Sequence, residues 1–164
     1  MIFRKHSGIY LLEVQQHLPL TLEQAWHFFS HPTNLEKITP RNMSFQITSP
    51  LTDKIYAGQI ITYKIGILPF FKTPWITEIT HIKEGSYFID EQRIGPYKMW
   101  HHEHFFKPED EGVLMTDKIS FSLPFSILGH IAYHLSIKNQ LKKIFNYRRE
   151  ALIEIFGEKN SILV

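Results

Sequence analysis

Hydrophobic and polar residues alternate along much of the chain, and this pattern predicts β-strands separated by turns. Gly, Pro and acidic residues stand between the alternating stretches, as is typical of turns. The predicted strands span residues 9–18, 45–48, 59–65, 75–82, 87–94, 98–107 and 113–123. Because the connections between the later strands are too short for crossover helices, we expect an antiparallel sheet of about six to seven strands.

Two short helices are predicted after the first strand, and one long helix ends the predicted fold. Thr21 and Gln24 have the spacing of a capping box and begin the first helix, which stops before Pro32. The second covers about residues 34–38. From about residue 127 to 156, apolar residues recur at helical spacing, and Gly157 is a typical helix stop.

The composition is that of an ordinary globular protein with an aromatic-rich interior. The chain has 164 residues, 43% of them hydrophobic, and a net charge of +2 with histidine neutral. This charge is too small to indicate a nucleic-acid partner. The absence of Cys excludes disulfides and thiolate chemistry. With no signal peptide or membrane-length apolar run, we expect a cytoplasmic protein.

Three strings carry a resemblance to a known family. They are PLTLEQAWHFFSHPTNLEKITP at 19–40, GPYKMWHHEHFF at 95–106 and TDKISFSLPFSILG at 116–129. Together with the element order, they resemble the START-like ligand-binding superfamily, in its polyketide cyclase/dehydrase-like (SRPBCC) group. The resemblance implies an α+β helix-grip fold, in which a curved antiparallel sheet wraps a long C-terminal helix. Residues 1–164 would then form one ligand-binding domain, with a core of about residues 10–156.

One carboxylate falls in the middle of an apolar row on the last strand. Side chains alternate between the two faces of a strand, so Asp117 shares its face with Met115, Ile119 and Phe121. That face must point inward because it is the apolar one. A lone buried carboxylate is costly, so we expect Asp117 to have a polar partner.

The neighbouring strand offers two histidines as that partner. Trp100, His102, His104 and Phe106 share one face of it, which we predict to point inward. Counting back from the acidic turn places Asp117 opposite His102 or His104. Directly opposed residues lie close enough for a carboxylate–imidazole hydrogen bond.

A further strand adds a row that has two possible orientations. Counting from the turn at Gly95 and Pro96 places Asp90 opposite about His102 and Gln92 opposite about Trp100. The alternative inward row on this strand is Ile89, Glu91 and Arg93, and the pattern does not decide between the two.

The predicted cluster has three interpretations: a structural network that holds register, a ligand-recognition site, or a catalytic acid–base site. A metal site of two histidines and an Asp is a variant of the third, although His-x-His on a strand is a weak signal. The family likeness implies no metal and no cofactor, and we expect neither. The candidate anchors are His102, His104, Asp117, Asp90 and Gln92.

The family likeness implies that the protein binds or carries a small hydrophobic molecule of lipid, polyketide or isoprenoid type. The alternative is a cyclase or dehydratase in which His102 or His104 moves a proton while Asp117 fixes its tautomer. The candidate cavity walls are aromatic and aliphatic residues from several elements: Trp26, Phe29, Tyr63, Trp75, Trp100, Phe121 and Leu135.

Two surface features have both a structural and a functional interpretation. The apolar segment Gly66 to Pro74, which we expect to be a loop, contains Phe70 and Phe71. The structural interpretation is that these side chains cap the core. The functional interpretations are a gate at the mouth of the cavity and a transient contact with a membrane. The basic residues of the long helix are the second feature. Their structural interpretation is a solvated helix face, and their functional interpretation is a surface that binds a partner. These basic residues are Lys138, Lys142, Lys143, Arg148 and Arg149. The sequence does not predict an oligomeric state.

Overall fold

The computed structural model describes residues 1–50, 52–68, 71–125, 129 and 131–157. Eight strands form one sheet in the order β1-β2-β8-β7-β6-β5-β4-β3, and every neighbouring pair is antiparallel. The strands are β1 (Ile2–His6), β2 (Ile9–Leu18), β3 (Gln46–Ile47), β4 (Gln59–Leu68), β5 (Phe71–Lys83), β6 (Tyr87–Ile94), β7 (Met99–Glu109) and β8 (Gly112–Ser122).

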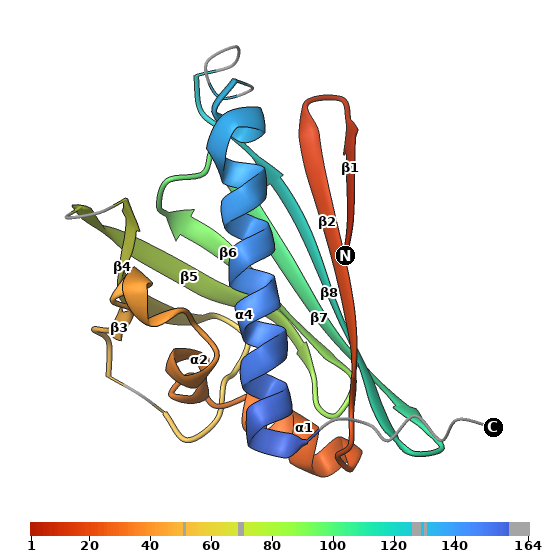
Figure 1. Cartoon of the computed structure of the whole chain (residues 1–164). Coiled ribbons are helices and arrows are strands. Elements are labelled where there is room, and N and C mark those ends of the chain that lie inside the picture. The colour runs from red at the N-terminus through yellow and green to blue at the C-terminus, as the bar shows by residue number, and fades with distance from the viewer. Residues whose placement is uncertain (51, 69–70, 126–128, 130, 158–164) are drawn as a thin grey trace.

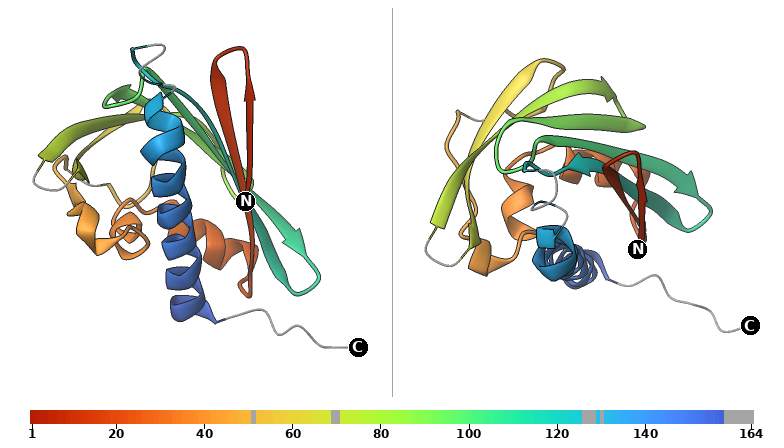
Figure 2. Two further views of the ribbon diagram at one scale, coloured as in Figure 1. Left: turned by 45° about the horizontal axis from the view of Figure 1, so that its top comes forward. Right: turned by 90° about the horizontal axis from the view of Figure 1, so that it is seen from above.

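The helices within the described residues lie on one side of this sheet (Figure 1). They are α1 (Leu22–Phe29), α2 (Asn34–Lys37), the 3₁₀ turn η1 (Arg41–Met43), the π-helical turn η2 (Tyr133–Ile137) and α4 (Lys138–Phe156). Figure 1 shows α4 lying across the strands, with α1 and α2 beside its lower half. The view from above in Figure 2 shows the sheet curving around this side of the molecule. The predicted α+β helix-grip fold is therefore confirmed.

The local signals for the first helix act as predicted. The side-chain oxygen of Thr21 accepts a hydrogen bond from the backbone N–H of Gln24 at 3.2 Å. The backbone N–H of Thr21 donates in turn to Oε1 of Gln24 at 2.9 Å. This reciprocal pair satisfies two donors that a helix start otherwise leaves open. The buried face of α1 is formed by Ala25, Trp26 and Phe28.

Two parts of the sheet extend further than predicted. The polar N-terminal residues form β1, which pairs with β2 in a hairpin. The segment 66–74, expected to be a loop, belongs largely to two paired strands, with Gly66 opposite Lys72 and Leu68 opposite Phe71. Backbone pairing along a hairpin does not require a polar–apolar alternation, which explains why the pattern missed it. Phe70 lies outside the described residues, and the side chain of Phe71 is not described.

The start of the long helix departs from the predicted periodicity. Leu135, predicted as a cavity wall, has 76% of its surface exposed, while Tyr133 is buried. Leu135 stands six residues before Leu141, a rotation of about 240° along a helix, so the two cannot share a face. The helix follows the phase set by Leu141, Phe145 and Leu152, which are all buried. At the other end, α4 stops before Gly157, whose φ is +87°.

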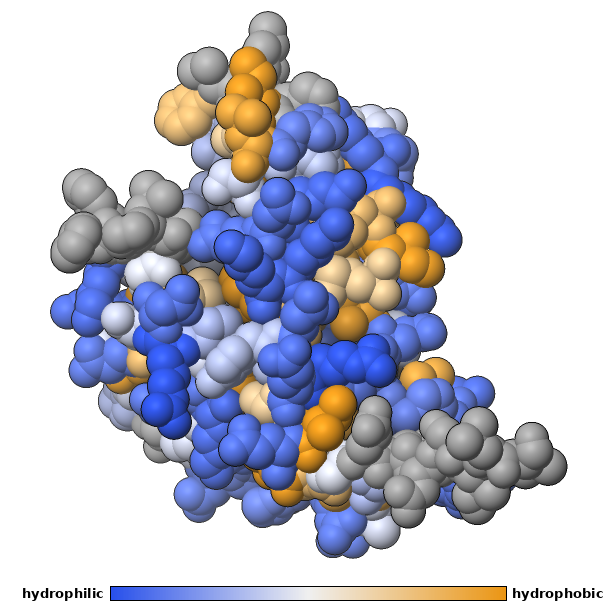
Figure 3. Space-filling model, viewed as in Figure 1, coloured by the Kyte–Doolittle hydropathy of each residue, from blue (hydrophilic) through white to orange (hydrophobic). Residues whose placement is uncertain are grey.

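The surface seen from the α4 side is largely hydrophilic, and its apolar areas are separate from one another (Figure 3). Lys142, Lys143 and Arg149 of α4 are exposed, in agreement with a solvated basic face. None of the described helices has the length and apolar character needed to span a membrane.

Candidate functional site

Strand β7 provides two histidines on its buried face. Trp100, His102, His104 and Phe106 alternate with residues that are only partly buried or exposed, as predicted. Only 5% of the surface of His102 and 7% of the surface of His104 is exposed to solvent. Their rings lie side by side with centroids 3.8 Å apart, and Phe88 stacks on His104 from β6. The alternation of the strand therefore carries both imidazoles to the interior.

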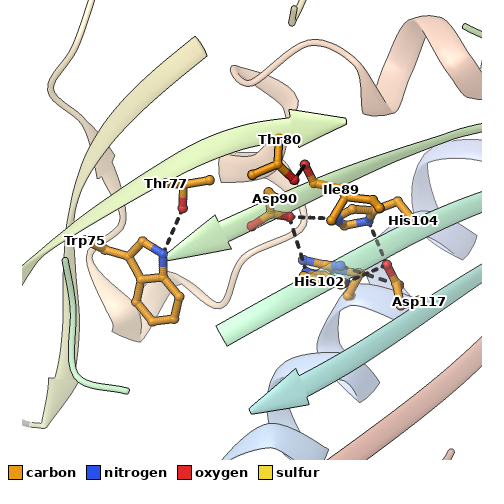
Figure 4. A network of polar contacts seen from close by, with 9 residues as sticks. Trp75, Thr77, Thr80, Ile89, Asp90, His102, His104 and Asp117 are labelled. Atoms are coloured by element: carbon orange, nitrogen blue, oxygen red, sulfur yellow. Dashed lines mark hydrogen bonds and ion pairs between the residues drawn. The ribbon is translucent and has the colours of Figure 1, made fainter. Parts of the chain in front are cut away.

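The neighbouring strands add one carboxylate on each side of this pair. On β8, Asp117 is opposite His104, which confirms the predicted register. On β6, Asp90 is opposite His102, again as predicted. The alternative inward row of β6 is wrong, because Phe88 and Asp90 point into the molecule while Arg93 is exposed. Figure 4 shows the two rings between Asp90 and Asp117.

Each carboxylate contacts both histidines. Nε2 of His102 lies 3.0 Å from Oδ1 of Asp117, and Nε2 of His104 lies 2.9 Å from Oδ2 of Asp90, both as hydrogen bonds. Nδ1 of His104 approaches Oδ1 of Asp117 to 2.8 Å, at an angle that does not make a hydrogen bond. Nδ1 of His102 lies 3.6 Å from Oδ2 of Asp90. One nitrogen of each ring thus faces Asp117, and the other faces Asp90.

Arg148 of α4 completes the network from the helix side. Its side chain is 11% exposed, and one terminal nitrogen lies 3.5 Å from Oδ2 of Asp117. The guanidinium also lies over the ring of Phe145, 4.9 Å from its centroid. Arg148 was predicted to belong to the solvated basic face, and that prediction is wrong. Its Nε is buried without a hydrogen-bond partner among the described residues.

The two histidines have opposite proton affinities. Burial and the neighbouring His104 lower the pKa of His102 below its usual value, against the effect of Asp117. Burial alone would also lower the pKa of His104, but its contacts with Asp117 and Asp90 outweigh burial and raise it. These directions favour a protonated His104 beside a neutral His102. The charges of His104 and Arg148 then balance those of the two carboxylates.

The carboxylates themselves are held in the ionised form. Burial alone would raise the pKa of Asp117, but the hydrogen bond with His102 and the close contact with His104 hold it well below its usual value. The pKa of Asp90 is lowered for the same reason, with His104 as the hydrogen-bond partner and burial opposing it.

A cavity of about 200 Å³ lies beside this network, between the sheet and the helices. Its walls are mostly apolar, with Phe28, Leu35 and Ile38 from the α1–α2 region and Leu141, Ile144 and Phe145 from α4. Asp90, His102, His104 and Arg148 bring the charged network to the lining, which also contains the polar residues His31, Asn34, Thr39, Thr77 and Gln140.

The predicted site residues divide into those that line the cavity and those that do not. The lining contains Phe29, Tyr63, Trp75, Asp90, Trp100, His102 and His104. It does not contain Trp26, Gln92, Asp117, Phe121 or Leu135. Asp117 lies behind the two histidines and touches them instead.

The other residues that miss the cavity have packing or turn contacts. Trp26 packs edge-on against Phe88 and Phe106. Gln92 bonds both the backbone N–H and the carbonyl of Tyr97 through its amide, at 3.3 and 2.7 Å. A Cβ on Gly95 would lie 2.3 Å from Oε1 of Gln92, so a side chain at this position would displace the Gln92 amide.

The fold and the cavity define a helix-grip protein with an apolar chamber and a buried charged network at its wall. Solved structures agree on the fold. The chain is similar to an Arthrobacter aurescens protein (TM-score 0.70, 10% identity, 99% of this chain and 97% of that one). It is also similar to protein Ms6760 from Mycobacterium smegmatis (TM-score 0.66, 14% identity, 94% of this chain and 98% of that one). A third similar structure is that of Ara h 8.0201 (TM-score 0.60, 11% identity, 90% of this chain and 99% of that one). No protein-family model and no curated protein matches the chain.

Proposed function

We propose that the protein binds or carries a small hydrophobic molecule in the cavity, with the polar end of that molecule at the charged network. The observation that carries this proposal is the combination of a mostly apolar chamber with four convergent polar side chains, Asp90, His102, His104 and Arg148. Ligand pockets in proteins typically have this composition, in which apolar walls supply affinity and a few polar groups fix orientation.

The size of the cavity limits the ligand. A volume of about 200 Å³ is below the roughly 300–1,000 Å³ of typical ligand pockets. A compact polyketide-like or isoprenoid fragment fits this volume better than a two-chain lipid. Arg148 lines the cavity, and its guanidinium is a hydrogen-bond donor suited to a carbonyl, hydroxyl or carboxylate oxygen of the ligand.

The test is native mass spectrometry of protein purified without detergent, followed by mass analysis of its organic extract. We expect a discrete added mass that disappears on denaturation. The Ile144→Trp variant fills the cavity and should lose the added mass. The Leu135→Trp variant adds the same side chain at an exposed position before the same helix, and should keep it.

A second measurement covers a ligand that is lost during purification. Titration with anilinonaphthalene sulfonate, a fluorescent apolar probe, should show binding by the wild type and by Leu135→Trp, but not by Ile144→Trp. If the filled variant and the control behave alike in both measurements, the proposed function is wrong.

A further inference from the structure

The network contains three groups whose donor atoms converge in one place. One donor atom each from Asp90, His102 and His104 lies within 4.8 Å of the other two. All three residues line the cavity, and both histidines are almost fully buried. A tetrahedral site with bonds of 2.0–2.2 Å places its donors about 3.4 Å apart. The distances from Oδ2 of Asp90 to Nδ1 of His102 (3.6 Å) and to Nε2 of His104 (2.9 Å) bracket this value.

The far side of each ring has the partner that a metal ligand needs. A histidine that binds a metal through one nitrogen usually gives its other nitrogen to a carboxylate, which fixes the ring and its tautomer. Asp117 faces this nitrogen in both rings: it is hydrogen-bonded to Nε2 of His102 at 3.0 Å, and it lies 2.8 Å from Nδ1 of His104, at an angle that does not make a hydrogen bond. Arg148 in turn holds the other oxygen of Asp117. Two ligands therefore share one outer carboxylate.

The arrangement of charge favours a cation at the same point. If each ring directs an N–H to Asp117, the two remaining nitrogen lone pairs point toward the Asp90 carboxylate. Three electron-rich groups then converge in a buried place, which a proton or a metal cation relieves. Imidazole and carboxylate donors suit Zn²⁺ and Fe²⁺ rather than Ca²⁺ or Mg²⁺, which prefer oxygen ligands.

We propose that Asp90, His102 and His104 form a binding site for a divalent transition metal of the Zn²⁺ type, oriented by Asp117 and open toward the cavity. A water molecule or a ligand oxygen from the cavity completes the coordination. This site does not depend on the proposed function, because it uses the polar wall alone and is tested with metal alone.

The experiment measures Zn²⁺ binding to chelator-treated full-length protein by equilibrium dialysis with metal analysis, and Co²⁺ binding by visible absorption. We expect one equivalent per chain. The Asp117→Asn variant changes the outer carboxylate and should lower the affinity for Zn²⁺ by about 10–100-fold. The Asp90→Asn variant removes the charge of a metal ligand with little change in shape, and should lower the affinity further. Circular dichroism checks that each variant is folded.

Two controls separate this site from other histidines. His101→Gln lies on the opposite face of β7, where His101 contacts Glu91, and should bind as the wild type does. The double variant His27→Gln/His31→Gln removes the pair whose rings lie 4.3 Å apart at the end of α1, and should also bind normally. The proposal is overturned if wild-type protein binds no Zn²⁺, if Asp90→Asn binds as tightly as wild type, or if the His27/His31 variant loses the metal.

Discussion

Strands β6 and β7 carry the same kinds of side chain on their two faces, in opposite surroundings. On the outer face, His101 bonds Glu91 at 2.9 Å, and Arg93 bonds Glu78 at 2.5 Å and Glu91 at 3.1 Å. On the inner face, the buried network joins the His102 and His104 pair to Asp90, Asp117 and Arg148. Both clusters therefore combine histidine, carboxylates and one Arg.

Exposure separates the two clusters. The side chains of the outer cluster are 27–46% exposed to solvent, whereas those of the inner cluster are 6–16% exposed. Water can replace a lost partner on the outer face but has little access to the inner one. An exposed ion pair contributes little to stability, while a buried charge without its partner is costly. The inner cluster must therefore be satisfied as a unit, and it constrains the sheet in a way that the outer cluster does not.

The largest expected effect comes from removing the charge that joins the whole inner network. Asp117→Asn leaves Arg148 and protonated His104 without their shared carboxylate, and should lower the free energy of unfolding by about 3–5 kcal/mol. Urea unfolding followed by circular dichroism measures this loss. A loss below about 1 kcal/mol would mean that the inner network is no more important than the outer one, and the comparison would fail.

The acid side of the stability curve sharpens the same comparison. The pKa of Asp117 is lower in the folded protein than its unfolded value of 3.8, so its contribution is present above that pH. This stabilising contribution is lost as the pH falls from 3.8 through the pKa of Asp117 in the folded protein, because the unfolded state binds the proton at a higher pH. The stability of metal-free wild-type protein should therefore fall toward that of Asp117→Asn in acid. A constant difference between the two at every pH below 5 would contradict this linkage.

The inner site was largely predictable because strand geometry is regular. Side chains alternate with a period of two, and the turn that closes β7 and β8 pairs Glu109 with Gly112, so counting from it fixes the register. This is why Asp117 could be placed opposite His102 or His104 from the sequence. The same counting from Gly95 placed Asp90 opposite His102.

The helical contribution to the site was missed for a different reason. A basic residue on a helix is usually solvated, and Arg148 was grouped with its exposed neighbours on that basis. It stands seven residues after Leu141 and three after Phe145, which places it on the buried face, and a long side chain can reach a carboxylate across a cavity. Helical spacing was therefore a usable signal. The shape of the cavity was not predictable, because it depends on how side chains from distant elements pack.

The smallest expected effect is on the outer face. Glu91→Gln removes the carboxylate that His101 and Arg93 share, in the same way that Asp117→Asn acts on the inner face. Because these groups remain hydrated, the loss in unfolding free energy should be about 0.2–1 kcal/mol and should shrink further at high salt, which screens exposed charges. The loss caused by Asp117→Asn should change little with salt, since buried pairs are screened far less. Urea unfolding of both variants at low and high salt makes the comparison directly. An outer loss as large as the inner one would show that residue type, rather than burial, sets the energy of these clusters.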